Sequence, residues 1–221
     1  CIQNLHVIFA IDRAGLVGSD GETHQGIFDL SYLSSIPNMT VMAPKNKWEL
    51  SDMMKFAVRY DGPIALRYPR GEAYDGLSRF RLPIEYGKWE TIYDENEIAL
   101  LAVGSMVKTA VEVRDRLRQM GYGCTLVNAR FVKPLDQEAI RTLQAEHQLL
   151  VTMEENVKSG GFGEAVLEYL NEIKSQTRAM VIALPDDYVE HGNVDLLKQE
   201  CGIDAESIIK KIVIEYIGLT K

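Results

Sequence analysis

An arginine, an aspartate and a histidine lie within one glycine-rich segment near the start of the chain. Residues 12–26 read Asp-Arg-Ala-Gly-Leu-Val-Gly-Ser-Asp-Gly-Glu-Thr-His-Gln-Gly and contain Arg13, Asp20 and His24. Arginine binds phosphate or carboxylate through two parallel hydrogen bonds, histidine transfers protons near neutral pH, and aspartate accepts hydrogen bonds. Glycines at this density let the backbone turn sharply and approach a ligand closely. The segment therefore predicts a binding or catalytic loop.

A second arginine, Arg70, follows another apolar run, at residues 64–68. Arg67 competes with it, but side chains alternate along an extended strand, so we expect the two arginines to face differently. The carboxyl ends of parallel strands share one edge of a sheet, where open α/β sheets place their sites. Arg13 and Arg70 are thus candidates for one anion site. Two interpretations remain open for both: phosphate binding, or ordinary salt bridges.

Other polar motifs have structural alternatives. An aspartate such as Asp20 often stabilises its own turn. No third ligand accompanies Asp20 and His24, so we expect no metal site. The Ser-Gly-Gly-Phe-Gly run at 159–163 precedes a strong helical pattern, where it would either cradle a phosphate or permit close packing. Glu154 and Glu155 follow an apolar run and are interpreted as a cap or solvated pair in preference to a catalytic dyad.

These residues need elements to position them, and the chain alternates between strand and helix patterns. Short apolar runs predict strands at 7–11, 40–43, 64–68, 88–93, 98–103, 124–127, 149–153 and 180–184. Amphipathic periodicity predicts helices around 28–33, 47–58, 107–117, 136–143, 162–173, 196–197 and 208–216. Residues 71–83 lack periodicity and predict a linker. The alternation predicts an α/β protein with two layers of mostly parallel sheet.

Composition limits the classes of partner. The net charge of the 221-residue chain is −8, which argues against nucleic acid, because binding phosphate backbones needs a basic face. No apolar run is long enough for a membrane helix. The three cysteines are far apart and form neither a disulfide framework nor a zinc motif, which favours the cytoplasm. The chain starts at Cys1, so we expect a chain that has lost its front part, with mature-protein processing as the alternative.

Several motifs together resemble one enzyme family, the 1-deoxy-D-xylulose-5-phosphate synthases. The most specific lie in the first 39 residues, and the later ones are shared more loosely with other transketolase-like proteins. The matching segments are Phe-Ala-Ile-Asp-Arg-Ala-Gly at 9–15, Asp-Gly at 20–21, Thr-His-Gln-Gly at 23–26, Phe-Asp-Leu-Ser-Tyr-Leu at 28–33, Ile-Pro-Asn-Met at 36–39, Arg-Tyr-Pro-Arg-Gly at 67–71, residues 128–136 and residues 152–156.

The resemblance implies a fold and an activity. It implies two three-layer α/β domains with mostly parallel sheets: most of a pyrimidine-binding domain at residues 1–80 and a transketolase C-terminal domain at residues 81–221. The family uses thiamine diphosphate and Mg²⁺ to join pyruvate to glyceraldehyde 3-phosphate, releasing CO₂ and giving 1-deoxy-D-xylulose 5-phosphate. That product leads to isoprenoid precursors and, in bacteria, to thiamine and pyridoxal. The family also implies a homodimer.

The resemblance also assigns roles to particular residues. Arg13 and Arg70 are similar to the family's pair that holds the acceptor phosphate. Asp20 would accept hydrogen bonds from acceptor hydroxyl groups, and His24 would donate or relay a proton near the reacting oxygens. Fixing the phosphate would orient the acceptor aldehyde for attack.

Parts of the family pattern are missing from these residues. The family's glutamate that activates the cofactor precedes the Asp-Arg-Ala-Gly segment, and no Gly-Asp-Gly diphosphate motif occurs in the chain. We therefore expect a fragment that neither holds thiamine diphosphate nor turns over alone and that acts with the N-terminal part of the enzyme. Two alternatives remain: the β subunit of a 2-oxo acid dehydrogenase, or a non-catalytic transketolase-like binding module.

Overall fold

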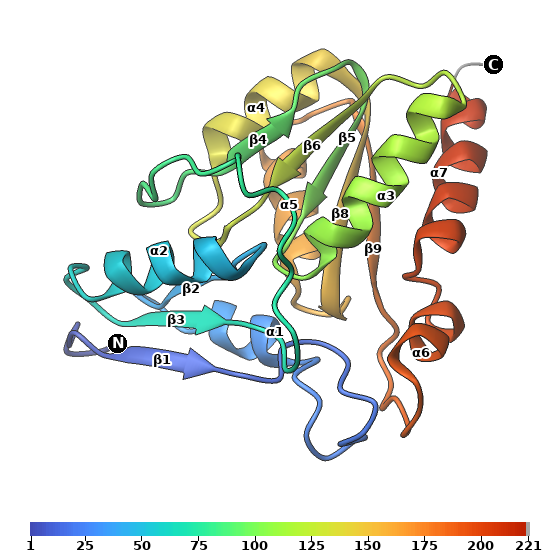
Figure 1. Cartoon of the computed structure of the whole chain (residues 1–221). Helices are drawn as coiled ribbons and strands as arrows, with labels where there is room; N and C mark the ends of the chain where they lie inside the picture. Colours follow the sequence, from blue (N-terminus) through green and yellow to red (C-terminus); the bar gives the residue numbers. More distant parts are fainter. Residues whose placement is uncertain (220–221) are drawn as a thin grey trace.

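The structure, a computed structural model, describes residues 1–219 and contains two β-sheets with helices packed on them (Figure 1). The strands are β1 (Ile8–Ile11), β2 (Thr40–Met42), β3 (Ile64–Arg67), β4 (Glu90–Tyr93), β5 (Glu97–Ala102), β6 (Cys124–Asn128), β7 (Phe131–Lys133), β8 (His147–Val157) and β9 (Arg178–Leu184). The helices are α1 (Asp29–Ser34), α2 (Lys47–Ala57), α3 (Met106–Gln119), α4 (Gln137–Glu146), α5 (Phe162–Glu172), α6 (Val194–Glu200) and α7 (Ala205–Leu219).

The first sheet has the order β1-β3-β2-β7, with β1, β3 and β2 parallel. Residues Ile11 and Arg67 are paired at the ends of β1 and β3, so the two following loops leave the same edge. Strand β7 is antiparallel to β2 and comes from the second half of the chain. The sequence patterns did not predict this three-residue strand, which makes the second half of the chain contribute to the first sheet.

The second sheet has the order β4-β6-β5-β8-β9 and is parallel except for the edge strand β4. Helix α3 packs with α7, and α4 packs with α5. The two pairs lie on opposite faces of the sheet, giving three layers (Figure 1). The expected fold class, two α/β units with mostly parallel sheets, is confirmed.

Helix starts follow the chemistry of their first residues. Asn46 accepts a hydrogen bond from the backbone N–H of Glu49, at 2.9 Å, and so caps α2 as its sequence predicts. Asp136 likewise caps α4 by accepting from the N–H of Ala139. The strong apolar face of α5 is buried through Phe162 and Val166. These local signals are confirmed where they were expected.

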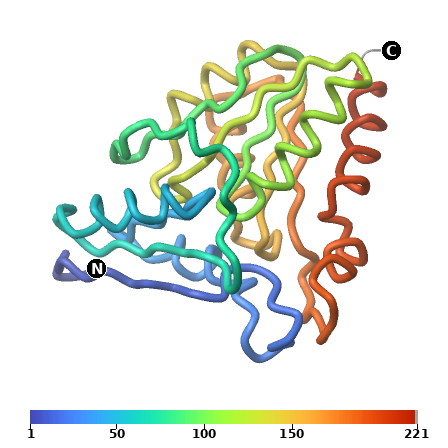
Figure 2. The backbone as a smooth tube through the Cα atoms, in the orientation of Figure 1, coloured from blue at the N-terminus to red at the C-terminus, as the bar shows by residue number. Residues whose placement is uncertain are grey.

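The two sheets share apolar core. One cluster joins Val41 and Leu66 of the first sheet to Ala99 and Leu101 of the second. The connecting segment, residues 71–83, contains no helix or strand, as expected, and crosses between the sheets (Figure 2). No helix within residues 1–219 has the length and apolar character needed to cross a bilayer.

Candidate active site

The glycine-rich loop, residues 12–26, connects β1 to α1 and is closed at its neck by backbone hydrogen bonds. The N–H of Gly26 donates to the carbonyl of Arg13 at 2.9 Å, and the N–H of Gly15 donates to the carbonyl of Gly26 at 2.8 Å. A Cβ on Gly26 would lie 2.4 Å from that Arg13 oxygen, so only glycine allows this approach. Arg13 itself has a φ of 59°, a left-handed conformation that is uncommon outside glycine.

Arg13, Asp20 and Arg70 meet at the carboxyl ends of β1 and β3. The Nε of Arg13 donates to Asp20 Oδ2 at 2.8 Å, and an Nη of Arg70 donates to Asp20 Oδ1. Arg13 also donates to Asp12 at 2.7 Å. Asp20 is therefore the common acceptor of both guanidinium groups, and the parallel pairing of β1 with β3 explains why loops 50 residues apart meet there.

The charge of this cluster is set by close contacts. Hydrogen bonds from Arg70 first, and then Arg13, lower the pKa of Asp20 to about 2. The contact with Asp20 is also the first cause that raises the pKa of Arg13. Side-chain exposure is 17% for Asp20 and 49% for Arg70, so the cluster opens to solvent. The carboxylate of Asp20 is ionised near neutral pH, and the guanidinium groups of Arg13 and Arg70 remain accessible to an anion.

His24 lies apart from the arginine pair. Its side chain is exposed, and its Nδ1 lies 2.8 Å from the hydroxyl of Thr23. Within residues 1–219, no hydrogen bond joins it to Arg13, Asp20 or Arg70. The structure thus brings three of the four expected site residues together and leaves His24 on the rim of the loop.

Arg67 turns into the protein, opposite to Arg70. Its Nε donates to Asp29 at 2.9 Å, and its Nη2 donates to the carbonyls of Gly26 and Glu155 at 2.7 and 2.8 Å. Its side chain is only 2% exposed. These buried hydrogen bonds hold the end of the glycine-rich loop. Because Arg67 is buried and Arg70 is exposed, the expectation that the two arginines face differently is confirmed.

Strand β8 supplies supporting contacts that the sequence patterns missed. Glu155 accepts hydrogen bonds from the N–H of Leu16 at 3.0 Å and from the hydroxyl of Ser105 at 2.7 Å. A Cβ on Gly15 would lie 2.5 Å from the Glu155 carboxyl carbon. Glu155 is buried, so a strand of the second sheet fixes the backbone next to Arg13. The sequence signal for these contacts was the acidic pair Glu154 and Glu155 at the end of an apolar strand.

The neighbouring glutamate, Glu154, caps helix α5. Its two oxygens accept from the N–H groups of Phe162 and Gly163 at 2.8 and 2.7 Å. This carboxylate fills the position at which residues 159–163 would have held a phosphate. The packing interpretation of that glycine cluster therefore holds, and the phosphate-cradle interpretation is wrong.

The loop after β9 packs against the glycine-rich loop. Gly192 donates its N–H to the carbonyl of Gly18 at 3.2 Å. The ring of His191 lies where a Cβ on Gly21 would be, within 2.3 Å. The two segments run side by side in Figures 1 and 2. A Cβ on Gly18 would likewise lie 1.8 Å from the carbonyl oxygen of Gly192, so Gly18 and Gly21 are both needed for contact with the second half of the chain.

The two sheets and the arginine–aspartate cluster at the strand ends define an α/β chain of the transketolase type. The chain belongs to the transketolase family: the model for "Transketolase, C-terminal domain" matches residues 87–208, more than half of the chain. The model for "Transketolase, pyrimidine binding domain" matches residues 1–75.

Curated relatives of the chain include 1-deoxy-D-xylulose-5-phosphate synthases. The chain is 55% identical, over 96% of its length, to 1-deoxy-D-xylulose-5-phosphate synthase of Lachnoclostridium phytofermentans, and covers 34% of that protein. It is 45% identical, over 96% of its length, to the synthase of Clostridium acetobutylicum, of which it covers 35%. The chain therefore spans about a third of the length of these relatives.

Solved structures agree on the fold. A chain described as "Split gene transketolase, inactive beta4 tetramer" superposes with a TM-score of 0.86 and 26% identity, over 100% of this chain and 69% of that one. Transketolase of Campylobacter jejuni gives a TM-score of 0.72 at 20% identity, over 93% of this chain and 31% of that one, and supports the fold alone.

Proposed function

We propose that this chain forms the acceptor-binding part of a thiamine diphosphate-dependent 1-deoxy-D-xylulose-5-phosphate synthase. The enzyme would condense pyruvate with glyceraldehyde 3-phosphate, with loss of CO₂. The proposal rests on one observation: Arg13 and Arg70 both donate hydrogen bonds to Asp20 at the ends of two adjacent parallel strands. The 55% identity to a curated synthase supports the choice of substrates.

In this proposal the two arginines hold the acceptor phosphate. Each guanidinium offers several N–H donors in a plane, which suits phosphate oxygens. Arriving phosphate competes with Asp20 for these donors. Asp20, displaced from the guanidinium groups, accepts hydrogen bonds from the acceptor hydroxyl groups. Holding the far end of the acceptor orients its aldehyde, and His24 transfers a proton at the reacting oxygen from the rim of the loop.

The cofactor needs groups beyond those of this chain. When bound, thiamine diphosphate supplies the electron sink for loss of CO₂ from pyruvate. Residues 1–219 contain no group of three His, Cys, Asp or Glu side chains placed to hold a metal ion. We propose that the Mg²⁺-diphosphate group is held by residues outside this chain.

We propose that the rest of the enzyme supplies the cofactor site, including the glutamate that activates the cofactor. The relatives are about three times as long as this chain, which supports this division. The family resemblance is the support for a homodimer in the cytoplasm. We place the boundary between the two domains near residue 80, in the segment without helix or strand.

Replacing Arg70 in the complete enzyme tests the phosphate assignment. We expect Arg70→Ala to raise the KM for glyceraldehyde 3-phosphate about tenfold or more, since a charged hydrogen-bond donor is lost. The KM for pyruvate should change little. Steady-state kinetics with each substrate varied in turn measure both values.

Arg81→Ala provides the matched control. Arg81 is as exposed as Arg70 and also pairs with an aspartate, Asp52, but lies in the linker. Its loss should leave both KM values unchanged. Equal increases for pyruvate and acceptor in Arg70→Ala would reject the assignment of Arg70 to the phosphate.

A further inference from the structure

A cavity of about 340 Å³ lies between the two halves of the chain, and the start of the linker forms part of its wall. Its walls come from four separate segments: the start of α2, the residues after β3, the first turn of α3, and α6. Small-molecule pockets have volumes of about 300–1,000 Å³. The cavity is therefore large enough for a small molecule, and none of Arg13, Asp20, His24 and Arg70 lines it.

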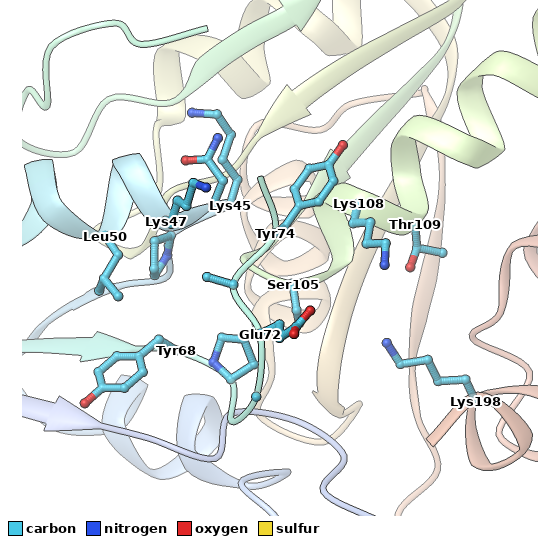
Figure 3. A pocket seen from close by; sticks show the side chains of 15 residues that line it. Lys45, Lys47, Leu50, Tyr68, Glu72, Tyr74, Ser105, Lys108, Thr109 and Lys198 are labelled. Carbon is cyan, nitrogen blue, oxygen red and sulfur yellow. The ribbon is translucent and has the colours of Figure 1, made fainter. Parts of the chain in front are cut away.

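One side of the cavity is apolar. Leu50 from α2 and Tyr68 after β3 lie on this side, next to Lys47 (Figure 3), and Pro69 also lines the cavity. Leu50 and Tyr68 are both partly exposed. Such a wall favours a ligand with an apolar body.

The opposite side is cationic. Lys108 and Thr109 come from the first turn of α3, and Lys198 comes from α6. Figure 3 shows the amino groups of Lys108 and Lys198 directed toward one another beside Thr109. Lys198 lies 3.5 Å from Glu155, whereas Lys108 forms no ion pair within residues 1–219. Two cationic groups thus face each other in a chain whose net charge is −8.

The acidic residue of the lining does not neutralise them. Glu72 lies beside Ser105 in Figure 3, and no ion pair within 4.0 Å joins it to a lysine of the described chain. Lys45 also lines the cavity, but its charge is already balanced by Glu49 and Glu90 at 3.1 and 2.6 Å. Lys108 therefore has no anionic partner among the described residues.

We propose that this cavity binds a small phosphorylated molecule with an apolar body. The phosphate lies between Lys108 and Lys198 and accepts a hydrogen bond from the Thr109 hydroxyl, and the apolar body covers Tyr68 and Pro69. The site is separate from the acceptor site, because none of Arg13, Asp20, His24 and Arg70 lines the cavity, although the neighbours of Arg70 do.

Phenyl phosphate is a suitable probe, because it combines a phosphate with an apolar ring. The 221-residue chain and its variants are titrated by calorimetry, and amide shifts in NMR spectra locate the bound probe. We expect Lys108→Gln to weaken binding at the cavity about tenfold, since one charged hydrogen bond is lost. Lys108 has no protein partner that its replacement would leave buried, so the variant should fold. Phenol, which lacks the phosphate, should bind more weakly.

Two further variants separate the two sites. Arg70→Gln should leave binding at the cavity unchanged, whereas it removes any binding at the acceptor site. Lys174→Gln, a lysine outside the cavity, should have no effect. Loss of all phenyl phosphate binding in Arg70→Gln, with unchanged binding in Lys108→Gln, would reject the cavity site and support the acceptor site. No binding by the unaltered chain, or shifts confined to other surfaces, would also reject it.

Discussion

Asp20 lies between the guanidinium groups of Arg13 and Arg70, where we propose that the acceptor phosphate binds. The pKa of Asp20 is lowered to about 2, with Arg70 the first cause and Arg13 the second. Its ionised form is therefore present throughout the neutral range. Because the folded pKa lies below the ordinary value of 3.8, the stabilisation from this cluster is present above about pH 4 and is lost as the pH falls toward 2.

We expect Asp20→Asn to strengthen the binding of inorganic phosphate at the arginine pair. The amide keeps the shape of the side chain but removes the charge that competes with phosphate. Exposed ion pairs contribute little, so a gain of roughly twofold to fivefold is expected. Calorimetric titration measures it.

Asp12→Asn is the control for this change, because Asp12 contacts only Arg13 of the pair and is 57% exposed. It should have a smaller effect than Asp20→Asn. Weaker phosphate binding by Asp20→Asn would mean that Asp20 holds the arginines in position instead of competing for them.

For individual residues, the sequence predicted that Arg13 and Arg70 meet, but not which side chain accepts their hydrogen bonds. Arg13 and Arg70 follow strands whose parallel pairing was expected, and parallel strand ends share an edge. The common acceptor, Asp20, lies in a loop whose path no periodicity defines. His24 shows the same limit: its place on the rim depends on the turn at residues 21–24, which the sequence pattern leaves open.

Strand β8 is the element on which the site loop depends most. The apolar pattern predicted a strand at 149–153, but the strand extends through Val157. Glu154, Glu155 and Asn156 are all buried, and each finds partners in another segment: the start of α5, the glycine-rich loop and the start of α1. The sequence pattern predicts that the strand ends at these polar residues, because their hydrogen-bond partners are distant in the sequence.

Glu154 gives β8 a pH dependence that can be measured. Burial raises the pKa of Glu154 from 4.5 to about 7, although hydrogen bonds from Gly163 and Phe162 oppose the shift. The protonated form is therefore favoured by folding. Its stabilisation is fully present below about pH 4.5 and is lost as the pH rises through 7. Urea unfolding should show a loss of about 3 kcal/mol across this window.

In Glu154→Gln this pH dependence should flatten, because the side chain no longer ionises. Glu164→Gln is the matched control: Glu164 lies in the first turn of α5, the helix that Glu154 caps, and accepts from the N–H of Gly160, but is exposed. It should keep the pH dependence of the unaltered chain. An unchanged slope in Glu154→Gln would assign the pH dependence to another group.

Across the whole molecule, a buried charged cluster joins the two halves. Lys45 and Glu49 come from the first half, and Glu90 and Arg130 from the second. The side chains of all four are at most 3% exposed, and Asn128 donates to both glutamates. Burial raises the pKa of Glu90, but Lys45 and Arg130 outweigh it and leave the value at about 2. No spacing in the sequence indicated this contact.

We expect Glu90→Gln to destabilise the chain by about 3 kcal/mol, because it leaves two buried cations facing one carboxylate. Urea unfolding followed by circular dichroism measures the change. Glu138→Gln is the control, since Glu138 pairs with Lys88 at the surface and is 81% exposed. It should change stability little. A similar small effect for Glu90→Gln would show that the cluster does not stabilise the contact between halves.

Strand β7 has a consequence for how the chain can be divided. It is encoded beyond the linker yet hydrogen-bonds to β2 in the first sheet. A nick anywhere within 71–83 would break one covalent connection and leave this ladder in place. The two halves of the chain are therefore not independent modules. Exchanging the second half by recombination would also replace β7, the edge strand of the first sheet.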